Sequence, residues 1–537
     1  MQWEQEDRLS ADMVARVVAR KVAEAARPGG RPLAEVINES LYHERERLAR
    51  QGDGSGVVSS DSLFLAAIRK ELPRAGRAQE ILLLTRIVER YAREIGGHFN
   101  PLVYGLATRA IPVGLSVVLS GLSPLRALRN PESLVRLSHQ VTLVGDREWL
   151  GRLASRGTLV FAPTHSSNLD SVVMGYALYR MGLPPVAYGA SIHLFNNPII
   201  GLFMRNVGAF AVDRRKTDPL YRESLKEFAT LTLESGRHGL FFPGGGRSRS
   251  NRVETRLKLG LLGTPLSAFY NALAAGRPSR IFVVPCTISY PLVLEASTLI
   301  DDYFQEAGRA RYIIEDDEFS QVRRWLDFIN ALAALEQQVV VTFANPLDPF
   351  GNDVDFEGRS LDPRGRIIEP ERYLLSRGTL REDRERDAEY TRDLAHRLSA
   401  SFHAHSVVFP THVLARAALR VLVRRFPQLD LYRLLRTLTP DTPLQLPEVE
   451  SETVALLDRL QQLEADGRIR LAPRTRTGSG QLIHEALRSF GSYHIRPVVE
   501  RQGSRLTIGD ANLLVYYSNR LDGYGLAGDS SLTEVPE

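Results

Sequence analysis

Apolar residues recur every three or four positions in two stretches near the start of the chain, residues 8–50 and 61–96. Leu84 and Ile87 in the second stretch illustrate the spacing. This is the period of an amphipathic helix, whose apolar side chains line one face. We therefore expect an N-terminal helical domain, residues 1–125.

The pattern changes in the middle of the chain, where short apolar runs alternate with longer amphipathic segments. Each run is short enough for a single strand, and the runs are residues 158–161, 186–191, 208–212, 239–242, 281–288 and 339–343. Strands that alternate with helices predict an α/β domain, residues 126–380, with a mixed, mostly parallel sheet covered by helices. Pro285 lacks an N–H donor and predicts a bulge or a sheet edge within its run.

The helical period returns in the last third of the chain, at residues 402–426 and 453–465. Residues 469–471 read as part of a hairpin, and an apolar segment, residues 512–518, lies near the end. We expect a C-terminal, mainly helical domain, residues 381–537. The predicted fold class is thus an α/β domain flanked on both sides by mainly helical domains.

Composition limits the class of protein. The 537 residues are 43% hydrophobic, enough for two or three domains with their own cores. A single cysteine, Cys286, excludes an intrachain disulfide and a cysteine-rich metal site, and its apolar neighbours suggest a small core residue. These features favour a globular protein of a reducing compartment.

The charge and hydropathy of the chain indicate which ligands and membrane contacts are compatible with it. The formal net charge of +5 suits phosphate-bearing ligands or anionic lipid surfaces, although a solvated surface of mixed charge would give the same balance. No apolar run reaches the roughly 18 residues of a membrane-spanning helix. The longest such run, residues 110–124, contains proline and glycine. It predicts a buried or interfacial helix and not a membrane span. The first residues do not resemble a secretory signal.

A histidine and an aspartate lie where the run at 158–161 meets a helical-looking segment, residues 171–181. We place His165 in the loop and Asp170 in the first helical turn, with Ser167 or Asn168 as the cap. A carboxylate that holds the tautomer of a neutral imidazole makes it a general base near pH 7. An aspartate favoured only by the helix dipole, beside a surface histidine, would give the same pattern.

Two further segments follow predicted strands and carry arginines. One ends in Arg214 and Arg215, and the other, residues 241–250, contains three glycines followed by Arg247 and Arg249. Glycines let backbone amides approach an anion, and a guanidinium offers a bidentate fork to a phosphate. The ends of neighbouring strands converge, so these segments can share a site with the histidine. A solvated strand end would explain the first segment equally well.

Several common catalytic motifs are missing from the sequence. It contains no His-Glu-x-x-His, no phosphate-binding P-loop and no Gly-x-Ser-x-Gly elbow. Their absence argues against a metalloprotease, a P-loop nucleotidase and a serine hydrolase of the elbow type.

In order and spacing, four segments resemble the sequence blocks of the glycerolipid acyltransferase family, the first matching its His-x4-Asp signature. They are residues 165–170, 208–214, 244–249 and 284–290. The resemblance covers roughly residues 143–295 well. The length and helical flanks look most like a bacterial glycerol-3-phosphate acyltransferase, and residues 513–519 are similar to a tyrosine-rich segment of the larger members.

The resemblance implies a mechanism. His165, oriented by Asp170, would remove the proton from a hydroxyl of glycerol 3-phosphate as that oxygen attacks an acyl thioester, either acyl-CoA or acyl carrier protein. Arg214, Arg247 and Arg249 would hold the phosphate, and backbone amides of residues 244–246 would help the developing oxyanion. The implied substrate-binding set consists of Arg214, Gly245, Gly246, Arg247, Ser248 and Arg249. The thioester is a co-substrate, and the resemblance implies no metal and no cofactor.

The same resemblance implies a role in phospholipid synthesis. The insolubility of the product, the apolar run at 110–124 and the excess of basic residues predict a peripheral protein on an anionic surface, at the cytoplasmic face of the cell membrane. The acceptor could equally be lysophosphatidate, and neither the donor nor its chain length follows from the sequence.

One position departs from the family pattern, because the family usually has Glu just before Gly-x-Arg-Ser and this chain has Gly244. The missing carboxylate leaves open a catalytically degenerate, membrane-docked lipid-binding protein. A winged helix that binds nucleic acid at residues 453–471 is a further alternative. The balanced charge of residues 456–463 speaks against it, so we expect no nucleic-acid partner.

Overall fold

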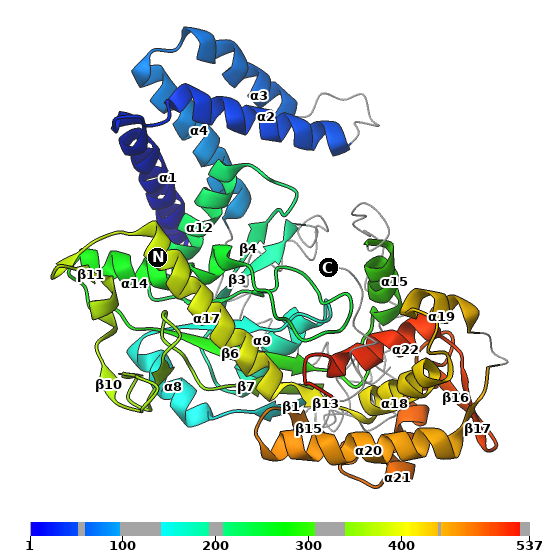
Figure 1. Cartoon of the computed structure of the whole chain (residues 1–537). Coiled ribbons are helices and arrows are strands. Elements are labelled where there is room, and N and C mark those ends of the chain that lie inside the picture. Colours follow the sequence, from blue (N-terminus) through cyan, green and yellow to red (C-terminus); the bar gives the residue numbers. More distant parts are fainter. Residues whose placement is uncertain are drawn as a thin grey trace, which may run out of the picture.

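The structure is a computed structural model that describes residues 2–51, 60–96, 141–192, 208–306, 339–438 and 442–526. The apolar run at 110–124 lies outside these residues. A central sheet carries a helical bundle at one end, formed by the start of the chain, and a helical region at the other, formed by its last third (Figure 1). None of the described helices is both long enough and apolar enough to cross a membrane.

The central sheet has seven strands within the described residues, in the order β1-β7-β6-β2-β5-β3-β4. All neighbours are parallel except β6 and β7, so the predicted mixed, mostly parallel sheet is confirmed. The strands are β1 (Val141–Val144), β2 (Thr158–Pro163), β3 (Val186–Ser191), β4 (Ala209–Val212), β5 (His238–Leu240), β6 (Ile281–Ser289) and β7 (Val339–Phe343). The six predicted runs all form strands, and only β1 was not expected.

Helices cover both faces of this sheet, which explains why the central strands are apolar along their whole length. The helices of the α/β region are α8 (Arg147–Arg156), α9 (Asp170–Arg180), α12 (Pro219–Glu234), α13 (Leu259–Leu262), α14 (Thr264–Ala274), α15 (Ala296–Glu306) and α17 (Arg384–His405). Side chains of β2 alternate between faces: Leu159 and Phe161 share a cluster with α9, while Val160 and Ala162 share one with α14 and α17.

Pro285 lies inside β6, which pairs with β2 on one side and β7 on the other. The expected sheet edge is therefore wrong. The ladder with the β7 chain is nevertheless interrupted here: the pairing passes from Cys286↔Phe343 to Val283↔Leu347, with one more residue on the β7 side. The missing N–H of Pro285 falls at this interruption, so it breaks no ladder bond.

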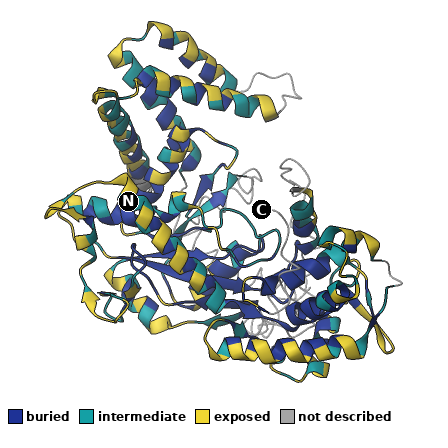
Figure 2. Ribbon diagram, viewed as in Figure 1, coloured by how far each residue is buried: buried dark blue, intermediate teal, exposed yellow. Residues whose placement is uncertain are grey.

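The N-terminal helices form a bundle that packs against α12. They are α1 (Gln2–Ala26), α2 (Leu33–Gln51), α3 (Ser60–Glu71) and α4 (Arg77–Ile95). Their apolar faces join those of α12 and β4 in one buried cluster, and polar faces point outward (Figure 2). The buried Lys216, just after β4, pairs with Glu94 of α4 at 2.5 Å and ties the bundle to the sheet.

The C-terminal region combines helices with short strands. The helices are α18 (Pro410–Arg425), α19 (Leu431–Thr437), α20 (Leu446–Ala465), α21 (Ser479–Phe490) and α22 (Ala511–Ser518). The strands are β13 (Val407–Val408), β14 (Leu444–Gln445), β15 (Arg470–Leu471), β16 (Val499–Gln502) and β17 (Arg505–Ile508). The expected hairpin at 469–471 is wrong, because β15 pairs in parallel with the distant β13. A neighbour that far along the chain leaves no local sequence signal.

Short strands follow β7 as small antiparallel ladders at the surface. These are β8 (Asp353–Val354), β9 (Ser360–Leu361), β10 (Ile367–Ile368), β11 (Leu375–Ser376) and β12 (Thr379–Leu380).

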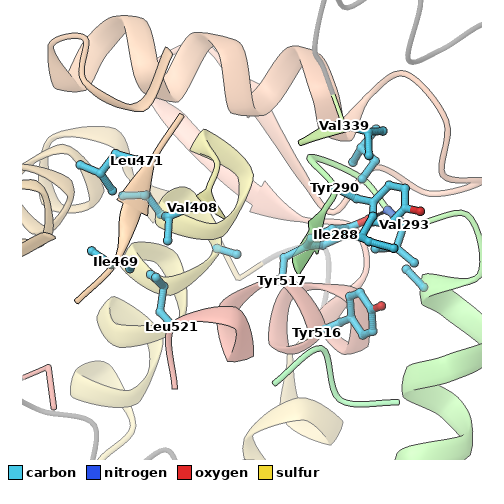
Figure 3. Packing of buried hydrophobic residues seen from close by; sticks show 14 of the residues in the cluster. Ile288, Tyr290, Val293, Val339, Val408, Ile469, Leu471, Tyr516, Tyr517 and Leu521 are labelled. Carbon is cyan, nitrogen blue, oxygen red and sulfur yellow. Dashed lines mark hydrogen bonds between the residues drawn. The ribbon is translucent and has the colours of Figure 1, made fainter. Parts of the chain in front are cut away.

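The C-terminal helices and the sheet share one buried cluster. Figure 3 shows Tyr516 and Tyr517 of α22 beside Ile288, Tyr290 and Val293, which belong to β6 and the segment after it. The Tyr517 hydroxyl accepts the backbone N–H of Val293 at 3.3 Å. The domain boundaries at 125 and 380 stay predictions, and α22 packs directly against β6 and the segment after it.

Candidate active site

The candidate site lies where four parallel strands end. His165 follows β2, Arg214 follows β4, the glycine-rich turn follows β5, and Tyr290 follows β6. Carboxyl ends of parallel strands meet at one edge of a sheet, which is the usual position of a site in an α/β domain. The sequence segments separated by more than a hundred residues are therefore brought to one place.

The imidazole of His165 contacts the carboxylate of Asp170. Nδ1 of His165 lies 2.8 Å from Oδ2 of Asp170, and the aspartate is completely buried. Oδ2 also accepts the backbone N–H groups of Ser166 and Ser167, and Oδ1 accepts the hydroxyl of Tyr290 at 2.6 Å. Four donors on one carboxylate fix its orientation. This arrangement places the Nδ1 proton on His165 and directs Nε2 away from Asp170.

The surroundings keep His165 neutral. His165 is 9% exposed, and its ring stacks on Phe242 with 4.2 Å between ring centroids. Burial lowers the pKa of His165 below 6.5 despite the opposing effect of Asp170, and the positive charges of Arg214 and Arg247 lower it further. A neutral imidazole near pH 7 can accept a proton, so the position suits a general base.

The loop before α9 is held differently from the expected cap. The N-cap residue is Leu169, and neither Ser167 nor Asn168 caps the helix with its side chain. Instead, the buried carboxylate of Glu295 accepts the hydroxyl of Ser167 at 2.8 Å and the N–H of Asn168 at 2.9 Å. The helix start is fixed by two acidic side chains, Asp170 within the helix and Glu295 beyond β6, and Glu295 could not be assigned from local sequence.

The glycine-rich turn packs directly against the histidine loop. Ser248 donates its backbone N–H to the carbonyl of His165 at 2.7 Å, and its hydroxyl donates to the carbonyl of Arg252. Gly245 has a φ of +75°, a left-handed conformation that favours glycine, and its N–H donates to the carbonyl of Phe242. These bonds hold the turn next to the imidazole.

The arginines of the substrate-binding set differ in their pairing. Arg247 lies 3.4 Å from Glu295, and Arg249 lies 3.5 Å from Asp302 of α15. Arg214 has no ion-pair partner among the described residues. Its pKa is lowered by partial burial of the guanidinium and by the neighbouring charge of Arg247.

Arg214, Gly246, Arg247 and His165 come together at the site. A Cβ added at Gly246 would lie 3.6 Å from a guanidinium nitrogen of Arg214, and the charges of Arg214 and Arg247 both act on His165. Arg249 is directed to α15 through its pair with Asp302. The unbalanced positive charge beside the imidazole is the kind of site that an anionic substrate would neutralise.

The C-terminal segment, residues 516–522, contacts the residues that follow the glycine-rich turn. The amide of the buried Asn251 donates to the carbonyl of Tyr516 at 3.2 Å, and Asn519 donates to the carbonyl of Ser250 at 3.1 Å. Arg252 pairs with Asp522 at 2.7 Å. The tyrosine-rich segment thus supports the glycine-rich turn, a connection that its sequence alone did not reveal.

Comparison with known proteins agrees with these features. Residues 146–289 match the family model described as Acyltransferase. Among curated proteins, the chain is 31% identical over 204 residues to a glycerol-3-phosphate acyltransferase of Pseudomonas fluorescens (strain Pf0-1), covering 37% of this chain and 22% of that protein. It is 32% identical over 199 residues to the enzyme of that name from Ectopseudomonas mendocina (strain ymp), covering 36% and 22%.

The matched region spans only about a fifth of the length of these curated relatives, 22% in both cases. Their names therefore bear on the α/β region, where the His165 loop and the glycine-rich turn both lie. The sequence motifs, the His165 loop with its glycine-rich turn, and the family match all lie in the same segment of the chain. Residues 146–289 of this chain match the acyltransferase family model, and the chain is similar over about 200 residues to part of the glycerol-3-phosphate acyltransferases.

Proposed function

We propose that this protein is an O-acyltransferase that moves a fatty acyl group from an acyl thioester to a hydroxyl of glycerol 3-phosphate. The observation that carries the proposal is the Asp170–His165 pair set beside the unbalanced charge of Arg214. The pair supplies a base for a hydroxyl, and the arginine supplies a partner for a phosphate on the same small molecule.

The base acts through Nε2 of His165. Nδ1 is engaged by Asp170, and Nε2 has no hydrogen-bond partner in the part of the chain that the structure describes. Nε2 takes the proton of the acceptor hydroxyl as its oxygen attacks the thioester carbonyl carbon. The resulting imidazolium is stabilised by the carboxylate of Asp170. As the carbon–sulfur bond breaks, the imidazolium returns its proton to the sulfur, and the thiol leaves with His165 neutral again. The transfer is direct, from thioester to hydroxyl.

The acceptor's phosphate binds in the arginine cluster. Arg214 offers a bidentate guanidinium without a competing carboxylate among the described residues, and Arg247 supplies a second positive charge beside it. Arg249 acts at longer range, because Asp302 partly neutralises it. Binding the phosphate here holds the hydroxyl near Nε2 and lowers the entropic part of the barrier.

The developing oxyanion is stabilised by the glycine-rich turn. The N–H of Gly245 is used by Phe242, and that of Gly244 interacts with Glu254. The N–H of Gly246 makes no hydrogen bond within the described residues, so it is the amide of this turn that remains for the oxyanion.

Gly244 is the observation that favours a second candidate, a lipid-binding protein on the same scaffold that no longer catalyses transfer. A missing carboxylate in the third sequence block is the kind of change that inactivates an enzyme. The two functions differ in one measurable outcome, because only the acyltransferase consumes the thioester.

We also propose that the protein works at an anionic membrane surface as a peripheral protein of the cytoplasmic face. The acylated product partitions into a bilayer, and the net charge of +5 favours anionic lipid. Flotation with vesicles of phosphatidylglycerol and phosphatidylethanolamine should carry the protein upward. Recovery in the soluble fraction at physiological salt would refute membrane attachment.

The function is tested by a product assay with two acceptors and two donors. Purified protein is incubated with labelled glycerol 3-phosphate or lysophosphatidate, and with palmitoyl-CoA or palmitoyl carrier protein. We expect labelled lysophosphatidate from glycerol 3-phosphate. Phosphatidate formed from lysophosphatidate alone would reassign the acceptor, and the absence of any acylated product with lysolipid binding intact would support the lipid-binding candidate.

A further inference from the structure

Gly244 is the position where the family usually has Glu, and the space beside it is already filled. A Cβ built at Gly244 would meet the side chain of Glu254, at 2.6 Å from Cδ, 2.6 Å from Oε2 and 2.9 Å from Oε1. These are the three nearest atoms, and all belong to one carboxyl group. The carboxyl group of Glu254, ten residues further along the chain, therefore occupies the space where the Cβ of a side chain at position 244 would lie.

This carboxyl group accepts a hydrogen bond from the loop that carries His165. Oε1 of Glu254 accepts the backbone N–H of His165 at 2.8 Å, and the backbone of Gly244 also interacts with it. On the other side of the same residue, Ser248 donates its N–H to the carbonyl of His165 at 2.7 Å. Both polar groups of the His165 backbone are thus held by the segment 244–254.

The carboxyl group is enclosed and uncharged. Oε2 is buried and has no hydrogen-bond partner in the described structure. Burial, with the negative charge of Asp170 as a smaller contribution, raises the pKa of Glu254 to about 8, against the opposing charge of Arg520. Glu254 is therefore protonated at neutral pH, and its Oε1 can accept the N–H of His165 without placing a second negative charge beside Asp170.

The backbone of Glu254 is anchored independently of its side chain. Its carbonyl accepts the hydroxyl of Ser399 on α17 at 3.2 Å, and Val253 before it is buried in the cluster under α17. The backbone of Glu254 is therefore fixed in place, and its side chain extends from there to the glycine-rich turn. The backbone angles of Gly244 would allow a side chain, since its φ is not in the left-handed region, so the obstacle to one is the carboxyl group of Glu254.

We propose that Glu254 is a positioning residue that replaces the missing side chain at position 244 and holds His165 and the glycine-rich turn in register for acyl transfer. This inference rests on the proposed acyltransferase function. Glu254 acts through the backbone of His165 and touches no substrate. It accounts for a working site in a chain that lacks the family's carboxylate, and it predicts that positions 244 and 254 are energetically coupled.

The test compares kcat and KM for glycerol 3-phosphate in five variants. Glu254→Ala removes the support, and we expect kcat to fall about 100-fold, with KM changed less than about threefold, because the base is misplaced while the arginines remain. Glu254→Gln keeps a neutral acceptor, so kcat stays within about threefold of wild type. Gly244→Ala forces the carboxyl group away and lowers kcat about tenfold or more.

The double variant Gly244→Glu with Glu254→Ala moves the carboxyl group back to position 244, and we expect kcat to recover at least about tenfold relative to Glu254→Ala. Glu452→Ala is the matched control, since Glu452 is a buried glutamate of α20 that pairs with Arg420, and its loss should leave kcat unchanged. Thermal melts of each variant identify any that fail to fold.

The possible results separate this inference from the proposed function. A wild-type chain that acylates no acceptor overturns both. An active wild type whose kcat is unaffected by Glu254→Ala overturns this inference alone, as does a Glu254→Gln variant as impaired as Glu254→Ala. A double variant Gly244→Glu with Glu254→Ala whose kcat stays as low as that of Glu254→Ala would also overturn it, because a carboxyl group at position 244 would then not replace the one from position 254.

Discussion

Replacing Asp170 with Asn removes a charge and keeps the shape of the side chain. Oδ2 of Asp170 accepts three donors, Nδ1 of His165 and the backbone N–H groups of Ser166 and Ser167, all within 2.9 Å. With the Asn carbonyl oxygen in that place, the amide NH2 replaces Oδ1, so the Tyr290 hydroxyl loses its acceptor. With the amide reversed, an NH2 group faces those donors, and His165 must adopt the other tautomer.

The magnitude follows from these contacts. One buried donor without an acceptor costs about 1–3 kcal/mol of folding stability. The imidazolium formed during transfer also loses its counter-charge, and misdirected proton transfer typically lowers rates by about 10²–10⁴-fold. We therefore expect kcat to fall within that range, which corresponds to about 3–5 kcal/mol of transition-state stabilisation. KM for glycerol 3-phosphate should change little, because the proposed phosphate site does not include Asp170.

The assay is steady-state transfer from palmitoyl-CoA to labelled glycerol 3-phosphate, with Asp218→Asn as a matched control. Asp218 is equally buried and accepts the hydroxyls of Ser40 and Tyr91 and the N–H of Leu220. Its substitution should cost similar stability and leave kcat intact. The reasoning is refuted if Asp170→Asn retains full kcat, if its effect lies entirely in KM, or if both substitutions lower kcat equally.

Three further predictions concern charges around the imidazole. Because the pKa of His165 is lowered below 6.5 and the neutral form is the base, kcat/KM should rise with pH through an apparent pKa below 6.5 and be level above about pH 7. An ascending limb at alkaline pH would contradict this. Arg214→Gln should raise KM for glycerol 3-phosphate about 10–100-fold through the loss of a charge-assisted bond, and an unchanged KM would place the phosphate elsewhere. Tyr290→Phe removes the hydroxyl bonded to Oδ1 of Asp170, so denaturant titration should show a stability loss of about 1–3 kcal/mol while kcat stays within about tenfold; unaltered stability would argue against that bond.

The secondary structure of the α/β region could largely be predicted because its signals are local. The strands at 186–191 and 339–343 begin and end where the apolar runs do. The position of His165 in a loop and of Asp170 in the first helical turn also followed from the change of period between strand and helix. Convergence of the strand ends followed from the topology of a mostly parallel sheet.

Features that depend on contacts between distant residues could not be predicted. The pairing of β13 with β15 joins residues 407–408 to residues 470–471, and the hairpin expected from local sequence is absent. The caps expected from Ser167 or Asn168 are replaced by the carboxylate of Glu295, more than a hundred positions away. In both cases tertiary packing decides between local alternatives of similar energy.

The role of Gly244 illustrates the same limit at the site. In the sequence, Gly244 is a missing carboxylate, whereas in three dimensions the carboxyl group of Glu254 fills the adjacent space. No periodicity or motif connects these two positions. Only the fold of the turn brings them together, and the fold therefore weakens the main sequence argument for a catalytically degenerate protein.

The most direct test of the account is the rate of acyl transfer to glycerol 3-phosphate by the His165→Ala variant. His396→Ala serves as the control, because His396 is exposed on α17. We predict that the wild type and the control form labelled lysophosphatidate at equal rates, and that His165→Ala lowers kcat by at least about 10³-fold while remaining folded. A folded His165→Ala protein that acylates glycerol 3-phosphate as fast as the wild type would contradict the assignment of His165 as the base.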